Sequence, residues 1–267
     1  MQVNTAEYQD HALFEDILQY AKFYKDLSFL NMHWLNQGTS GAINMDTYIF
    51  TSIQGTLESI FDIVKKGRIN DGYALLRKYY DSSIINLYTN LYISDHFSIE
   101  NFVVEKIENW RRGTDTIPSF GKMSEYILAS DKVKEISALL YANGGFKSSV
   151  FESIRQRCND HTHYLYYHTV LLNDNKVYLK ERSAVLERFR TDLREIFVLH
   201  LGYLFYLNDH YMMSSDYLDL LECGERPSEE LQYEVAPFVQ RIFDEVIKPL
   251  RLDIADAIKG HTKMRLS

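Results

Sequence analysis

The chain has 267 residues, 46% of them hydrophobic, so it can bury a large core as one domain or two small ones. Its net charge of −8 argues against a protein that coats nucleic acid through bulk electrostatics, but leaves room for a local basic cleft. The N-terminal segment has no signal-peptide pattern, no apolar run is long enough for a membrane span, and Cys158 and Cys223 form no disulfide framework. We therefore expect a cytoplasmic protein that does not contact membranes.

The N-terminal third has apolar residues at helical spacing, which predicts three helices, over residues 8–35, 44–67 and 72–93. The stripes of the first and third are Leu13, Ile17, Ala21, Tyr24 and Leu27, and Leu76, Tyr80, Ile84 and Leu87. Asn44 or Asp46 would cap the second helix. Only the short turn at residues 68–71 separates the second and third helices, so they should form an antiparallel hairpin.

The remainder predicts more helices, over residues 98–113, 122–130, 132–145, 147–168, 182–212 and 231–259. Residues 196–207 are nearly all apolar and should lie at the centre of the core. Residues 176–181 are predicted to be a strand or an extended edge, and Pro237 and Pro249 should interrupt the last helix. The expected fold class is all-α, an antiparallel helical bundle over residues 1–180 with additional C-terminal helices over 181–267 that pack on it in the same domain.

One short segment, Ser153 to His168, gathers two arginines, an Asn-Asp pair and three histidines. On a helix, spacings of four share a face. Its two predicted faces are Arg155, Asn159 and His163, and Arg157, His161 and Tyr164. His161 and His163 are two residues apart and point away from each other on a helix, and no HExxH pattern is present, so we expect neither a metal nor a cofactor.

Several chemistries remain open for this segment. Metal-free cleavage of RNA needs a base for the ribose 2′-OH, a role that suits histidine, and a cation for the phosphate charge, a role that suits arginine. A structural alternative is a polar seam that satisfies buried hydrogen bonds, and the spacing alone favours it. Two weaker readings are a nucleophilic Cys158, which lacks a glycine-rich surround for an oxyanion hole, and a metal site built from His161, His163 and His168.

The sequence RCNDHTH resembles the motif of the HEPN superfamily, all-α proteins with an Arg, four to six residues and then a His. Arg157 and His163 match it, with Asn159 between them, and Arg155 and His161 match it in an alternative register. A second stretch, GRINDGYALLRKYYDSSIINLY, resembles the helix hairpin of HEPN-like proteins of the bacterial defence and abortive-infection type. Arg77 and Asp81 take the matching positions there, and the resemblance covers roughly residues 57–168.

The resemblance implies a homodimer in which two copies of the motif form one metal-independent ribonuclease site, in bacterial defence or a toxin–antitoxin system. His163 would be the general base or acid, Arg157 would stabilise the charge on the phosphate, and Asn159 would position the phosphate or the histidine. Arg155, His161, Asp81 and Arg77 are second-rank candidates, and an antitoxin or regulatory protein is a possible partner. The alternative is a non-catalytic HEPN-type module that binds RNA, a nucleotide or a protein. The tyrosines that follow the motif either stack on unpaired bases or belong to the core and interfaces.

Overall fold

The computed structural model describes residues 1–35, 41–98, 100, 103–142, 149–224 and 232–267. Helices dominate this part of the chain, which confirms the all-α prediction. The α-helices are α1 (Ala6–Gln9), α2 (Leu13–Leu35), α3 (Gly41–Lys65), α4 (Ile69–His96), α5 (Glu105–Arg111), α6 (Phe120–Ala129), α7 (Lys134–Leu140), α8 (Val150–Thr162), α9 (Tyr167–Val170), α10 (Arg182–Leu207), α11 (Ser215–Glu222), α12 (Pro237–Ile242), α13 (Lys248–Leu250) and α14 (Leu252–His261).

Short 3₁₀ helices and one π-helical segment complete the helical structure: η1 (Asp131–Val133), η3 (Leu171–Asn173), η4 (Asp209–Met212) and the π segment η5 (Phe243–Ile247). The two strands, β1 (Tyr233–Glu234) and β2 (Met264–Arg265), form a short parallel pair. Among the described residues, no helix is both long and apolar enough to cross a lipid bilayer.

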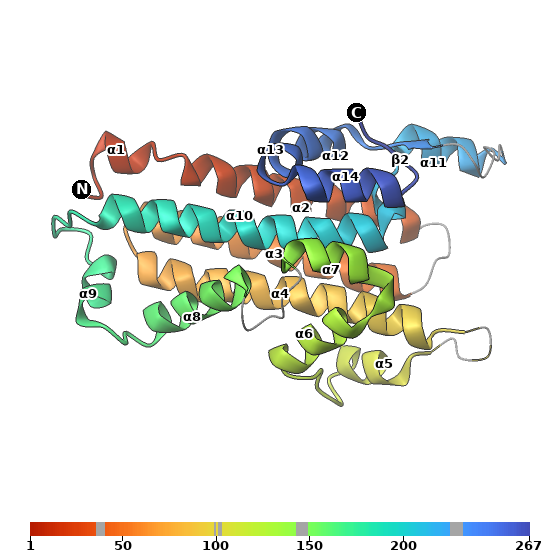
Figure 1. The fold of residues 1–267 in the computed structure, drawn as a ribbon, viewed down its shortest axis with the longest axis horizontal. Helices are drawn as coiled ribbons and strands as arrows, with labels where there is room; N and C mark the ends of the chain where they lie inside the picture. Colours follow the sequence, from red (N-terminus) through yellow and green to blue (C-terminus); the bar gives the residue numbers. More distant parts are fainter. Residues whose placement is uncertain (36–40, 99, 101–102, 143–148, 225–231) are drawn as a thin grey trace.

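Four long helices, α2, α3, α4 and α10, form the body of the molecule (Figure 1). The predicted hairpin is confirmed, because α3 and α4 pack side by side and only residues 66–68 separate them. Contacts between Asp16 and Arg190 and between Tyr24 and His200 show that α10 runs parallel to α2. The elements from α5 to α9 lead the chain back to the end of the bundle where α2 and α4 begin. Because α10 starts at this end, it runs in the same direction as α2.

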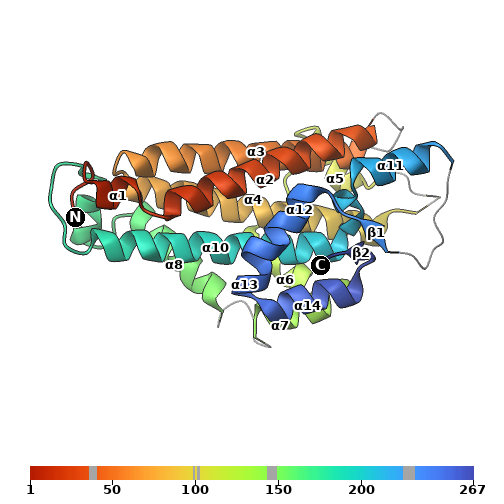
Figure 2. The same ribbon diagram turned by 90° about the horizontal axis from the view of Figure 1, so that it is seen from above.

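The predicted apolar stripes lie in the core. All nine stripe residues of the first and third helices are buried, and so is every residue from Ile196 to Tyr206 in α10. The C-terminal elements cover this body from one side, with α12 against α2 and α14 against α10 and α7 (Figure 2). Burial of these apolar faces is the main force that holds the helices together, since isolated helices are marginal in water.

The structure corrects several predicted boundaries. Residues 176–181 form neither a strand nor a sheet edge, and the strand pair lies at residues 233–234 and 264–265 instead. Pro237 is the first residue of α12 rather than an interruption, since the N–H that proline lacks has no intrahelical partner at this position. The interruption predicted near Pro249 is confirmed, because α13 ends at Leu250 and α14 starts two residues later.

The predicted caps of α3 are wrong, and one of the two residues belongs instead to a chain of hydrogen-bonded polar side chains in the centre of the bundle. Because α3 begins at Gly41, Asn44 and Asp46 lie inside the helix. The buried carboxylate of Asp46 accepts hydrogen bonds from Asn86 Nδ2 (2.6 Å) and Tyr211 Oη (2.6 Å), while Asn86 Oδ1 lies 2.9 Å from His200 Nε2. Burial raises the pKa of Asp46 to about 7 and lowers that of His200 to about 3. These groups are sealed in the core and fix the register of α3, α4 and α10.

Candidate functional site

Helix α8 carries the arginine and histidine cluster and lies against α4 and α10. Ser149 caps it, with the Ser149 hydroxyl accepting from the backbone N–H of Glu152 at 3.4 Å. Phe151, Ile154 and Cys158 point into the core with no exposed surface. This apolar stripe fixes the rotation of α8, so the polar residues on either side of it are aimed at different neighbours.

The first of these polar groups joins α8 to the middle of α4. Arg155 donates to Asp81 Oδ1 at 2.6 Å, and its guanidinium lies 3.6 Å from the centre of the Phe120 ring. Arg77 donates to Asn159 Oδ1 and lies 3.9 Å from Asp81 Oδ2. Arg77 and Asp81 keep about a third of their side-chain surface exposed, 31% and 35%. Two guanidinium groups share one carboxylate here, so the group carries an excess positive charge that solvent can reach.

Arg157 faces α10 and belongs to a different environment. Its Nε and Nη2 donate to the two carboxylate oxygens of Asp192 at 2.8 and 2.5 Å. Asp192 is 1% exposed, and burial raises its pKa even though the guanidinium opposes this shift. Two hydrogen bonds between a guanidinium and a buried carboxylate use the recognition geometry that would otherwise fit a phosphate. Arg157 therefore serves first to neutralise Asp192.

His161 points toward the beginning of α4. Its Nδ1 lies 2.7 Å from Asn70 Oδ1, and its ring stacks on Tyr73 with centroids 3.9 Å apart. Because the carbonyl oxygen can only accept, His161 Nδ1 carries the proton and donates. Burial lowers the pKa of His161 to about 4, so the ring is neutral at physiological pH.

His163 is the exposed histidine of the motif. It is the residue that ends α8, and its backbone N–H still donates to Asn159 O at 2.9 Å. That bond continues the helical geometry, so His163 stands one turn beyond Asn159 on the same face as Arg155. The residue is exposed, and its imidazole makes no hydrogen bond to any residue in the described chain.

The contacts separate the motif residues into the two faces that the helical spacing predicts. Arg155 and Asn159 meet Asp81 and Arg77 on one side, with His163 following. Arg157 and His161 make their contacts elsewhere, with Asp192 and Asn70. Neither of the two Arg-to-His registers therefore places its arginine and its histidine on a common face.

Three residues that contact the motif side chains were not predicted from the sequence: Asp192, Asn70 and Tyr73. A signal for Asp192 was present, because it interrupts the otherwise apolar face of α10 between Phe189 and Ile196. A charged residue at such a position requires a partner of opposite charge. The sequence holds no comparable signal for Asn70, since an asparagine in the first turn of a helix is common.

Other chemistries have little support from the described residues. Cys158 is fully buried and its pKa is raised to about 12, so it stays a thiol. Within the described ranges, no group of three His, Cys, Asp or Glu side chains is arranged to hold a metal ion. His168, the third histidine of the alternative metal site, stacks on Tyr166 with ring centroids 5.7 Å apart.

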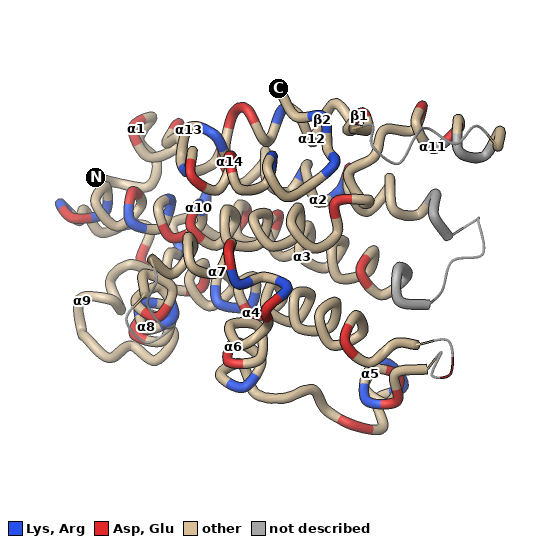
Figure 3. Tube along the Cα trace, turned by 45° about the vertical axis from the view of Figure 1, so that its right-hand side comes forward, with Lys and Arg blue, Asp and Glu red and all other residues tan. Residues whose placement is uncertain are grey.

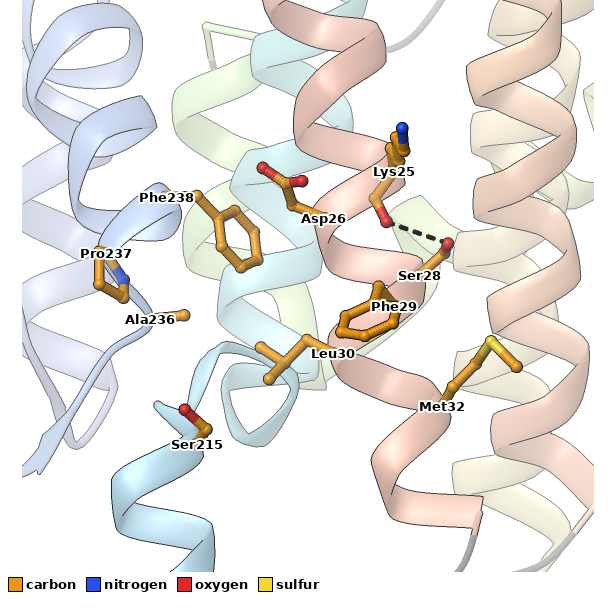
Figure 4. A pocket seen from close by; sticks show the side chains of 10 residues that line it. All are labelled: Lys25, Asp26, Ser28, Phe29, Leu30, Met32, Ser215, Ala236, Pro237 and Phe238. Carbon is orange, nitrogen blue, oxygen red and sulfur yellow. Dashed lines mark hydrogen bonds between the residues drawn. The ribbon is translucent and has the colours of Figure 1, made fainter.

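An apolar groove of about 610 Å³ lies away from α8, between α2 and the beginning of α12 (Figure 4). Phe29 and Leu30 from α2 and Phe238 from α12 line it. Two of its polar side chains are engaged locally, because Ser28 donates to Lys25 O at 3.1 Å and Asp26 accepts from Lys22 at 2.6 Å. The groove offers apolar surface but no converging polar groups, so it suggests no chemistry.

Comparison of the chain with protein-family models, with curated proteins and with solved structures gave no match. The candidate site therefore stands on its geometry. Figure 3 shows the mixture of positive and negative residues along α8, in a protein whose overall charge is negative.

Proposed function

We propose that the exposed face shared by α4 and α8 is a metal-independent endoribonuclease site. The observation that carries the proposal is the grouping of Arg77, Arg155 and Asn159, of which Arg77 is 31% and Arg155 18% exposed, with His163 one helical turn further on the same face. A cation for a phosphate and a free imidazole are the two groups that cleavage by the ribose 2′-OH requires.

In the proposed reaction, His163 removes the proton of the 2′-OH, and the 2′ oxygen attacks the adjacent phosphorus. The bond from phosphorus to the 5′ oxygen breaks, and that oxygen takes a proton from water or from a protonated histidine of a second copy of the site. The products are a 2′,3′-cyclic phosphate and a 5′-hydroxyl. Arg77 and Arg155 stabilise the extra negative charge on the phosphate oxygens, and Asn159 orients Arg77 through their hydrogen bond.

Arg157 takes a positioning role in this proposal. Its two hydrogen bonds to Asp192 hold α8 against α10, and 27% of its side chain remains exposed. The resemblance to the HEPN superfamily supports the ribonuclease reading, a homodimer and a role in bacterial defence or a toxin–antitoxin pair. Light scattering tests the dimer, which would have twice the 31.4 kDa mass of one chain.

The contacts of Arg157 and His161 favour a second candidate function. Both side chains are engaged inside the protein, as expected of a polar seam. A protein built in this way would be a non-catalytic helical module whose α4–α8 face binds RNA, a nucleotide or a protein partner. The same exposed residues would then recognise the ligand without cleaving it.

An RNA cleavage assay in excess EDTA separates the two functions. We expect wild type to leave cyclic-phosphate ends, and His163→Ala and Arg77→Ala each to lower the rate by about 100-fold or more. His261→Ala is the matched control, because His261 is also exposed but lies on α14, and it should cleave like wild type. Failure of folded wild type to cleave any RNA would refute the nuclease and leave the binding module.

A further inference from the structure

An exposed aromatic surface follows α8 directly. It consists of Tyr164, Leu165, Tyr166 and Tyr167, whose exposed fractions are 46%, 56%, 56% and 79%. The described chain exposes five tyrosines, and three of them stand in this stretch of four residues. Contiguous exposed aromatic residues are unusual on a monomer and mark a binding surface.

The backbone beneath the aromatic surface is fixed to the start of α4. Asn70 donates from Nδ2 to the carbonyl of Thr169, which is 3% exposed. Asn173 Nδ2 lies 3.3 Å from the Tyr164 hydroxyl and 2.9 Å from Asp71 Oδ1. Tyr164 itself has φ of +48°, in the left-handed region, which turns the chain sharply after the helix. The backbone that carries the rings is therefore fixed in advance of binding, although the Tyr166 ring must leave its stack on His168 to meet a ligand.

The charge around the aromatic surface is unlike that of the rest of the protein. Residues 161–173 contain three histidines and no carboxylate, although the whole chain carries a net charge of −8. The carboxylates that border this surface, Asp160, Asp174 and Asp71, accept from Gln156, from the backbone N–H groups of Lys176 and Val177, and from Asn173. They keep their negative charge, so the phosphates of a polyanion would be drawn to the guanidinium groups of Arg77 and Arg155, and its flat uncharged groups would meet the aromatic surface.

We propose that Tyr164, Tyr166 and Tyr167 stack on the unpaired bases of single-stranded RNA while its phosphates reach Arg77 and Arg155 on the adjoining face. This inference rests on the proposed function for the class of ligand, but not on catalysis. Bases in a duplex are stacked on one another and hide their faces, so the surface selects single strands. It reads no particular sequence, because every base has a π-face.

The test is a binding measurement with an oligonucleotide that cannot be cleaved. Fluorescence anisotropy with 2′-O-methyl oligouridine of about twelve nucleotides reports binding whether or not the protein is a nuclease, since the attacking 2′-OH is blocked. We expect wild type to bind it more tightly than a duplex of equal length. The double variant Tyr166→Ala/Tyr167→Ala should bind about tenfold or more weakly, and Tyr166→Phe/Tyr167→Phe, which keeps the rings, should bind within about twofold of wild type.

Tyr48→Ala is the matched control. Tyr48 is 73% exposed but lies near the start of α3, beside Asp46, which contacts Asn86 far along α4 from Asn70. Its loss should leave binding unchanged. Equal binding of single strand and duplex, or unchanged binding by the double alanine variant, would overturn the inference. So would a double variant that turns a dimer into a monomer by light scattering without weakening RNA binding, because the aromatic surface would then be an interface between two copies. Binding without cleavage would uphold this inference and refute only the nuclease.

Discussion

Replacement of Arg157 by alanine should destabilise the fold, and this effect must be separated from any effect on activity. The guanidinium makes two hydrogen bonds to Asp192, which is 1% exposed and sits in the apolar face of α10. After truncation, the carboxylate would remain in the same place without a cation. Removal of one partner from a buried ion pair costs about 3–5 kcal/mol. Because 27% of Arg157 is exposed, water can reach part of the vacated space, and we expect about 3 kcal/mol.

The free energy of unfolding that Arg157→Ala loses should increase with pH. Burial already raises the pKa of Asp192, and loss of the guanidinium raises it further. A folded-state pKa above the unfolded value gives stability that is present at low pH and is lost as the pH rises through the folded-state value. The penalty should therefore be smallest at low pH, where the carboxyl group takes up a proton, and should grow as the pH rises.

Urea unfolding followed by circular dichroism at several pH values measures this penalty. The double variant Arg157→Met/Asp192→Leu should recover most of the lost stability, since apolar residues can replace a buried ion pair. Arg112→Ala is the control, because Arg112 is an exposed partner of Glu108 and should leave the unfolding midpoint unchanged. If Arg157→Ala unfolds with the same free energy as wild type, or loses the same stability at every pH, then Arg157 does not neutralise a buried Asp192.

Two further predictions concern stability. The folded state keeps His161 neutral, with a pKa of about 4, while the unfolded chain takes up a proton below about pH 6.5. The free energy of unfolding of wild type relative to His161→Gln should thus fall by about 2 kcal/mol between about pH 7.5 and pH 5, and a constant difference would contradict this. A Cβ at Gly72 would overlap Val64 Cγ2, on a stiff branched side chain, so Gly72→Ala should cost about 1–2 kcal/mol. Gly55 in α3 has open space around it, so Gly55→Ala should stabilise the protein by up to about 1 kcal/mol. If the two substitutions shift the urea midpoint equally, the close approach of α3 and α4 at Gly72 is unimportant for stability.

Much of the fold could be predicted from the sequence because helical periodicity is a local property. The stripe from Leu13 to Leu27 and the apolar run from Ile196 to Tyr206 mark faces that must leave water, whatever they pack against. Few glycines and prolines leave few places to break a helix, which predicts long elements. The same local reasoning failed at Pro237, because a proline that breaks a helix and a proline that starts one have the same sequence signature until the preceding residues are seen to form a strand.

The helical repeat is enough to place Arg155, Asn159 and His163 on one face of α8, so this grouping could be predicted from their spacing. The neighbours of each face could not, because they depend on how α8 packs against α4 and α10. Asp81 and Asp192 both lie far from α8 in the sequence. Buried Phe151 and Cys158 set the rotation of α8, and with this rotation Arg155 pairs with Asp81 and Arg157 pairs with Asp192. The exposure of Tyr164, Tyr166 and Tyr167 was likewise beyond the sequence, since tyrosine occurs as readily in a core as on a surface. The partners of the arginines and the exposure of the tyrosines depend on contacts between distant segments, which the residue pattern within one helix does not indicate.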